Sequence, residues 1–120
     1  MANIQEKIAK LFPEATFEES DILLVNIPDA KWHDLAKCLK DELQFDQLVT
    51  IVGMDWKEQL GAVYYINCTA NNTQISVKVI ATGDREKPML HSVYDVWAVA
   101  TLFEREVYDF FGIIFVNNPD

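Results

Sequence analysis

Residues 47–80 read QLVTIVGMDWKEQLGAVYYINCTANNTQISVKVI. Apolar and polar side chains alternate in three runs of this segment, at 48–52, 62–69 and 74–80. A period of two is typical of β-strands that cover one face and leave the other open. Asn71 and Asn72 suit the positive φ angles of a tight hairpin turn, and residues 57–61 supply a longer turn. The segment therefore predicts three consecutive strands.

The first 46 residues predict two helices and two short strands. Apolar side chains recur at helical spacing before Pro13, at Ile4, Ile8, Leu11 and Phe12. Strands at 16–18 and 22–27 follow, separated by a polar turn. Asp29 then predicts the N-cap of a second helix. The apolar face of that helix holds Trp32, Leu35, Ala36, Leu39 and Leu43. The order of helix, two strands, helix and three strands predicts an α+β fold, a two-layer sandwich with the helices on one side of a mixed sheet.

The C-terminal part contains a charged run, EREVYDFFG at residues 104–112, inside an otherwise apolar segment. Read as a helix, the run turns its charged side chains outward and has one apolar face, formed by Phe103, Val107, Phe110 and Phe111. Gly112 suits the left-handed residue that ends a helix. Ser92 and Asp95 have the spacing of a capping box that starts an earlier helix. We therefore expect C-terminal helices after the sheet.

Three carboxylates in this run, Glu104, Glu106 and Asp109, allow two interpretations. One is a small enzyme in which they form an acid–base pair or a metal site, since this spacing brings side chains together on a helix. A bundle metal site also needs a second carboxylate helix and a Glu-x-x-His motif, and the sequence has neither. The other interpretation is a structural ion network in which Arg105 pairs with Asp109 one turn later. We favour the ion network, because the sequence also lacks a Gly-rich phosphate loop, a nucleophile elbow and a zinc motif.

Composition limits the function classes. A chain of 120 residues predicts one domain over 1–120, because this length suits a single core. The net charge of -9 repels phosphate backbones and acidic lipid surfaces, so we expect no nucleic-acid partner. The sequence has no apolar run of the ~18–20 residues that a membrane helix needs, and its N-terminus lacks the layout of a signal peptide. We therefore expect a cytoplasmic protein without direct membrane insertion.

Cysteine and histidine usage predicts no metal centre in this chain. Cys38 and Cys68 have no second Cys or His at ligand spacing, so we interpret both as reduced, half-buried packing residues. His33, on the second helix, and His91, in the loop before Ser92, share no predicted site. Five aromatic side chains between residues 97 and 111 fit either a core or a docking surface. These are Trp97, Phe103, Tyr108, Phe110 and Phe111.

The C-terminal segment resembles the signature of the 30-kDa subunit of respiratory complex I, the NADH-quinone oxidoreductase. That family shows Ser-Val near a tryptophan, Glu-Arg-Glu, then Asp, Gly-Ile and, a few residues later, His-Pro-Asp. The matching residues are Ser92, Val93, Trp97, Glu104, Arg105, Glu106, Asp109, Gly112, Ile113, Phe115, Pro119 and Asp120. The segment is also similar to the equivalent small subunit of energy-converting, membrane-bound nickel-iron hydrogenases. Two positions depart from the complex I pattern, because Leu102 stands where tryptophan is frequent and Asn118 where histidine is usual.

The resemblance implies a non-catalytic subunit in the hydrophilic arm of a complex I-like electron-transfer assembly. Its implied partners are a 49-kDa-like subunit, related to the hydrogenase large subunit, and a small subunit with the terminal iron-sulfur cluster. It implies no cofactor in this chain, iron-sulfur clusters in the partner subunits, and a cytoplasmic position peripheral to the membrane through the complex. Two host reactions stay open, NADH to quinone and hydrogen coupled to ferredoxin, as does a free-standing adaptor. The predicted partner-binding residues are Trp97, Glu104, Arg105, Glu106, Tyr108, Asp109, Gly112, Ile113 and Phe115.

Overall fold

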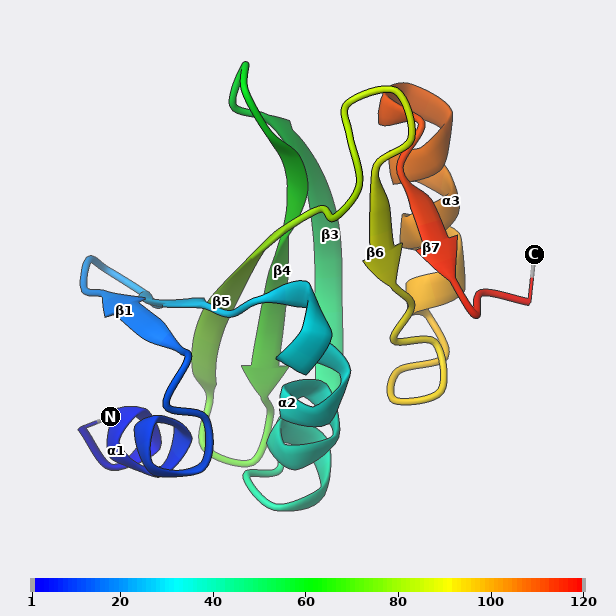
Figure 1. The fold of residues 1–120 in the computed structure, drawn as a ribbon. Helices are drawn as coiled ribbons and strands as arrows, with labels where there is room; N and C mark the ends of the chain where they lie inside the picture. Colours follow the sequence, from blue (N-terminus) through cyan, green and yellow to red (C-terminus); the bar gives the residue numbers. More distant parts are fainter. Residues whose placement is uncertain (1, 120) are drawn as a thin grey trace.

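The computed structural model of the chain describes residues 2–119 and has an α+β architecture (Figure 1). A mixed five-stranded sheet has the strand order β1-β2-β5-β4-β3, and a separate two-stranded sheet pairs β6 with β7. Three helices complete the fold of these residues. The predicted order of helix, two strands, helix and three strands is confirmed, and so is the mixed sheet.

The N-terminal elements agree with the apolar spacing of the sequence. Helix α1 (Ala2–Leu11) ends before Pro13, and β1 (Thr16–Glu18) pairs antiparallel with β2 (Leu23–Asn26). Helix α2 (Asp29–Asp41) buries Trp32, Leu35, Ala36 and Leu39 as the sequence predicted, whereas Leu43 lies beyond the end of the helix and is partly buried. The predicted N-cap is wrong, because Pro28 occupies that position and makes no side-chain cap. The Asp29 carboxylate instead accepts a hydrogen bond from the backbone N–H of His91 at 2.8 Å.

The three predicted strands are β3 (Gln47–Asp55), β4 (Leu60–Cys68) and β5 (Thr73–Ile80). They form an antiparallel meander, and β5 also pairs in parallel with β2. Lys57 and Asn72 adopt positive φ angles of 74° and 58° in the two connections, where the sequence predicted turns. Tyr64 lies at the centre of the sheet between Ile51 and Val77, and its ring is fully buried.

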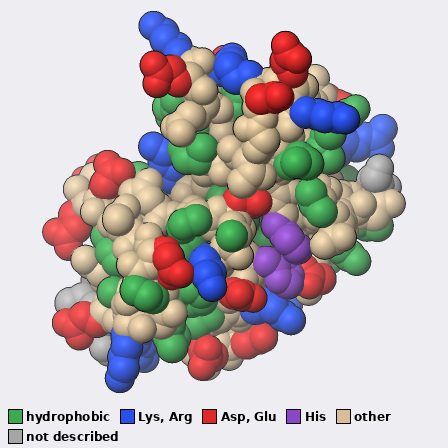
Figure 2. Space-filling model, viewed as in Figure 1, with side chains coloured by type: hydrophobic (Ala, Val, Ile, Leu, Met, Phe, Trp, Pro, Cys, Tyr) green, Lys and Arg blue, Asp and Glu red, His purple; other side chains and the backbone are tan. Residues whose placement is uncertain are grey.

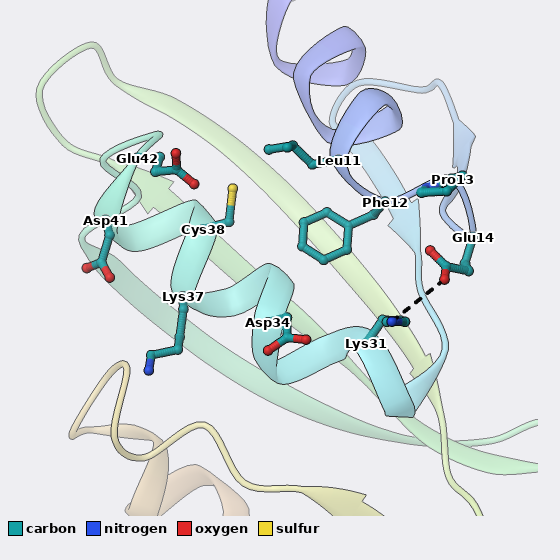
Figure 3. A pocket seen from close by; sticks show the side chains of 10 residues that line it. All are labelled: Leu11, Phe12, Pro13, Glu14, Lys31, Asp34, Lys37, Cys38, Asp41 and Glu42. Carbon is teal, nitrogen blue, oxygen red and sulfur yellow. Dashed lines mark ion pairs between the residues drawn. The ribbon is translucent and has the colours of Figure 1, made fainter.

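The helices α2 and α3 cover the same face of this sheet. The ring of Trp32 on α2 lies 4.6 Å from the ring of Tyr64, and Phe111 on α3 packs directly over Gly53 of β3. Gly53 follows Ile51 by two residues, and Ile51 pairs with Tyr64, so the three side-chain positions point to one face. Helix α1 lies beside α2, since Phe12 and Cys38 line a common groove (Figure 3). The predicted two-layer arrangement is confirmed.

Residues 89–118 form a compact segment, defined here as the C-terminal unit. It consists of β6 (Met89–His91), a turn-rich connection, α3 (Ala100–Phe111) and β7 (Ile114–Val116). Strands β6 and β7 pair in parallel, and this small sheet was not predicted because three-residue strands carry no periodicity. The unit contains one helix, so the predicted earlier helix that starts at Ser92 is wrong. The Ser92 hydroxyl accepts the N–H of Tyr94 at 3.2 Å within a turn.

Within residues 2–119, no helix is long and apolar enough to cross a membrane.

Candidate functional site

The carboxylate of Glu104 lies inside the C-terminal unit. Its side chain is 1% exposed, on the face of α3 that packs inward. Its Oε1 accepts hydrogen bonds from the Ser92 hydroxyl at 2.6 Å and from the Asn118 amide at 2.7 Å. Its Oε2 accepts the backbone N–H of Val93 at 3.0 Å. Glu104 therefore ties the connection before α3 and the segment after β7 to the helix, and the prediction that its charge faces outward is wrong.

Burial raises the pKa of the Glu104 carboxyl above its ordinary value of 4.5, and the hydrogen bonds from Ser92, Val93 and Asn118 oppose that rise. A carboxyl with a raised pKa in the folded state binds a proton more tightly there than in the unfolded chain. Its contribution to the free energy of unfolding is therefore largest at acidic pH and falls as pH rises from about 4.5 through the folded pKa.

The Glu104→Gln variant isolates this contribution. We expect the difference in free energy of unfolding, wild type minus variant, to decrease as pH rises above about 4.5 and then to level off. Urea unfolding at half-unit pH intervals measures the difference. Subtracting the variant from the wild type cancels the pH dependence that the other carboxyl groups contribute to both proteins. A difference that stays constant, or that increases with pH, would contradict a raised pKa at Glu104.

The charged residues that follow Glu104 are exposed and form no ion pair within residues 2–119. Arg105, Glu106 and Asp109 lie on the outer side of α3. The ion pairs among the described residues are Lys31–Glu14, Arg85–Asp55 and, when His33 is protonated, His33–Asp95, so the predicted pair of Arg105 with Asp109 is wrong. An exposed pair at this spacing contributes only ~0.3–0.5 kcal/mol, which is too little to fix two long side chains. Both groups are therefore available to another molecule.

Several large apolar side chains on α3 are also exposed. Phe110 is 83% exposed, Leu102 65% and Tyr108 54%. The buried stripe of the helix runs through Ala100, Glu104 and Val107, so placing Phe110 on the packed face was wrong. The reason is that Glu104 occupies the centre of the buried stripe and rotates Phe110 toward solvent. Of the five aromatic residues considered above, Phe103 and Phe111 pack against the core, as Trp97 does within it.

Of the other predicted partner-binding residues, three are buried in the core and one, Gly112, ends α3. Trp97, Ile113 and Phe115 are buried, and the indole N–H of Trp97 donates to the carbonyl of Phe45 at 3.0 Å. Gly112 ends α3 with a left-handed φ of 71°, as predicted, and its N–H donates to the Tyr108 carbonyl. The side chains of the three buried residues therefore act within the chain, where they hold the helix in place.

A groove of about 640 Å³ runs between α3 and the end of the chain. It is lined by Glu104, Arg105, Tyr108, Asp109, Ile114, Phe115 and Asn118. Together with the exposed side chains above, it forms one surface, the docking face. We define the docking face as Leu102, Arg105, Glu106, Tyr108, Asp109, Phe110 and Ile114, all of which are exposed.

The alternative of a carboxylate enzyme finds no support in this geometry. Glu104 is buried, whereas Glu106 and Asp109 are exposed on the outer side of α3. Within the part of the chain that the structure describes, no three His, Cys, Asp or Glu side chains are grouped so that they could hold a metal ion.

The second large groove, between α1 and α2, also lacks an activated group (Figure 3). It has a volume of about 680 Å³, and Cys38 lies at its edge. Burial and a hydrogen bond with Glu42 raise the pKa of the Cys38 thiol to about 11. A thiol with this pKa stays protonated at neutral pH and is a poor nucleophile. Cys38 and Cys68 are both free and buried, which confirms that they pack inside the chain and corrects the expectation of half-burial.

The two histidines lie together, contrary to the sequence prediction. The imidazoles of His33 and His91 stack with their ring centroids 4.5 Å apart. Figure 2 shows the pair side by side on the surface. Nothing in the local sequence indicates this contact, because it depends on how the C-terminal unit sits on α2.

Comparisons with known proteins agree with this architecture. The C/D subunit of NADH-quinone oxidoreductase from Bacteroides thetaiotaomicron is 39% identical over 105 residues, which cover 78% of this chain and 20% of that protein. The chain therefore spans about one fifth of the length of this curated relative. The solved structure of Nqo5, as its trypsin-resistant fragment (1–134), has a TM-score of 0.83 at 28% identity and covers 99% of this chain and 96% of the fragment.

A chain of the membrane-bound sulfane sulfur reductase, an archaeal respiratory membrane complex, has a TM-score of 0.85 at 26% identity. The alignment covers 98% of this chain and 71% of that one. Residues 25–120 match the family described as respiratory-chain NADH dehydrogenase, 30 Kd subunit, and therefore include strands β3, β4 and β5 and the C-terminal unit. This chain belongs to that family.

Proposed function

We propose that this chain is a non-catalytic structural subunit in the hydrophilic arm of a complex I-like electron-transfer assembly, and that it binds its neighbours through the docking face. The observation that carries the proposal is the exposure of Phe110, Leu102 and Tyr108 beside Arg105, which is exposed on the same helix. Aromatic side chains and arginine are the residues that protein interfaces concentrate, and they supply most of the binding free energy.

The partners in this proposal are a 49-kDa-like subunit, related to the hydrogenase large subunit, and the small subunit that bears the terminal iron-sulfur cluster. This chain holds no cofactor of its own in the proposal, and the iron-sulfur clusters belong to the partner subunits. It lies on the cytoplasmic side, peripheral to the membrane through the complex. Of the two branches we favour NADH-quinone oxidoreductase, supported by the 39% identity to a subunit of an enzyme of that name. The energy-converting hydrogenase branch is the alternative.

Purification of the native complex through a tag on this chain tests the assignment. We expect a hydrogenase-large-like subunit to copurify. A partner without the metal-ligand cysteines of a nickel-iron hydrogenase would support the complex I branch, and one with those cysteines would support the hydrogenase branch. A chain that copurifies with no other subunit would contradict the proposed function.

Phe110→Asp is expected to weaken assembly by at least about thirtyfold, equivalent to about 2 kcal/mol, the loss typical of an aromatic hot spot. Arg105→Ala and Asp109→Ala should also reduce assembly more than they reduce folding. All three side chains are exposed, so the free energy of unfolding should change by no more than about 0.5 kcal/mol. Quantitative copurification and urea unfolding measure the two effects.

Leu11→Asp is the matched control, because Leu11 is a large apolar side chain, 56% exposed, that lies on α1 outside the docking face. This variant should assemble normally. The docking face would be excluded if Phe110→Asp and Leu11→Asp assembled equally well. It would also be excluded if Arg105→Ala lost much stability while assembling normally.

A further inference from the structure

The stacked histidines join two parts of the chain that are distant in sequence. His33 lies on α2 and His91 on β6, and their rings are tilted by 35° at a centroid distance of 4.5 Å. His33 Nε2 lies 2.8 and 2.9 Å from the two carboxylate oxygens of Asp95, in the connection that leads to α3. An ionised carboxylate only accepts hydrogen bonds, so His33 Nε2 carries a proton in this contact.

The second ring is held by different partners. His91 Nδ1 lies 2.7 Å from the carbonyl oxygen of Ser92, which can only accept, so Nδ1 is the protonated nitrogen of the neutral ring. Its Nε2 is then an acceptor, and the Asn117 amide donates to it at 3.3 Å. A proton added at His91 Nε2 would meet this donor and, when His33 is charged, a cation in the neighbouring ring. Of the two rings, His33 is the one that makes a direct hydrogen bond to a carboxylate, that of Asp95.

Three polar contacts connect α2 to the C-terminal unit. The Asp29 carboxylate accepts the backbone N–H of His91, and the Lys40 ammonium donates to the carbonyl of Val96 at 2.7 Å. Together with the contact between His33 and Asp95, they place three attachment points along one side of α2. The unit that bears the docking face is thus held on α2 by charged and polar groups at its rim.

We propose that His33, His91, Asp29 and Asp95 form a proton-responsive clasp, which holds the C-terminal unit against α2 more tightly when His33 is protonated. Protonation adds a positive charge to the donor of the hydrogen bond between His33 and the Asp95 carboxylate, so the contact becomes an ion pair with an additional Coulomb attraction. Histidine is the side chain type whose ordinary pKa places its change of charge near neutral pH. Because the C-terminal unit bears the docking face, the clasp also fixes the position of the docking face relative to α2. The relevance of that position to partner binding rests on the proposed function; the clasp itself does not.

Other charged groups face the two rings and must be separated from His33 in any test. The carboxylates of Asp29 and Glu104 both interact with His91, and burial is the main cause that raises the pKa of each. Asp95 faces His33 from the connection before α3. Variants at His33 therefore decide whether His33 itself responds to the proton.

Amide hydrogen exchange of the free chain, followed by NMR at pH 6 and pH 8 and corrected for intrinsic exchange, tests the clasp. The reporter amides are those of Val96 and Trp97, which donate to the Val93 carbonyl within the connection held by Asp95. We expect their protection to be about two- to fivefold higher at pH 6, because closing the connection then forms a partly exposed ion pair between His33 and Asp95. The amide of Tyr64, in the internal strand β4, reports global unfolding and should not follow the same ratio.

The His33→Gln variant is the conservative test, because its amide can donate to Asp95 but cannot be protonated. Its reporter amides should show equal protection at both pH values, close to that of the wild type at pH 8. Asp95→Asn should also abolish the pH dependence. When both imidazoles are neutral, their ¹⁵N chemical shifts should identify the Nδ1–H tautomer at His91.

The clasp is wrong if the wild-type ratio is unity, or if His33→Gln keeps the pH dependence and so assigns it to Asp29, Glu104 or His91. An Nε2–H tautomer at His91 would also overturn it. Because these measurements use the free chain, their failure leaves the copurification result untouched, and a failed copurification leaves the clasp untouched.

Discussion

Replacement of Glu104 by alanine is expected to lower the free energy of unfolding by about 3–5 kcal/mol, because a cavity and an unpaired buried donor both contribute. The change removes the acceptor for the Ser92 hydroxyl, the Val93 N–H and the Asn118 amide. The Val93 donor is then buried without a partner, and the deleted atoms leave a cavity, so two costs add. Urea unfolding, followed by tryptophan fluorescence and far-UV circular dichroism, measures the loss.

Glu106→Ala is the matched control, because it removes the same side chain from the same helix at an exposed position. We expect it to change the free energy of unfolding by less than about 0.5 kcal/mol. Equal effects at residues 104 and 106 would mean that the buried carboxylate does not hold the C-terminal unit together. The contrast also separates the two acidic residues of Glu-Arg-Glu by role, since one stabilises the unit and the other belongs to the docking face.

A side chain at residue 53 should also have a large effect. A Cβ added to Gly53 would lie 2.5 and 2.6 Å from two ring carbons of Phe111 and 3.1 Å from a methyl group of Val107. Helix α3 would therefore have to move away from β3. We expect Gly53→Val to lower the free energy of unfolding by about 3 kcal/mol, at the upper end of the usual cost of overpacking. Urea unfolding measures this loss as well.

Combining Gly53→Val with Phe111→Leu tests whether contact with the Phe111 ring causes the loss of stability. A smaller side chain at 111 relieves the contact, so the double variant should be more stable than the sum of the two single effects predicts, by about 1 kcal/mol. If the two effects simply add, the loss at residue 53 does not arise from contact with α3. A Gly53→Val chain as stable as the wild type would show that β3 and α3 are not in close contact.

Local patterns were sufficient for the elements of the main sheet. Alternation along 74–80 and helical spacing before Pro13 each involve neighbours in sequence, so they predicted β5 and α1 directly. The C-terminal unit was predicted less well. A helix was predicted in the connection before α3 because Ser92 and Asp95 have capping-box spacing. In the structure the Ser92 side chain bonds to Glu104 and the Asp95 side chain bonds to His33, both distant in sequence. Non-local hydrogen bonds replaced the local one that the motif predicts.

The candidate site shows the same division. Exposed Arg105, Glu106, Tyr108 and Asp109 could be identified from the charged run, and so could the end of α3 at Gly112. The burial of Glu104 could not, because a lone carboxylate normally prefers water. It becomes acceptable only where donors from two other segments surround it. Phe110 was consequently placed on the wrong side of the helix.

The sequence by itself determined the order of the helices and strands up to residue 80, the single covered face of the sheet and the family of the chain. These properties depend on side-chain period, turn residues and a motif, all of which are local. Only the tertiary structure decided which acidic residue is buried, which aromatic residues are exposed and that His33 meets His91. Those outcomes depend on how β6, α3 and β7 pack on α2 and β3, and the free energy of that packing comes from contacts between residues far apart in the chain.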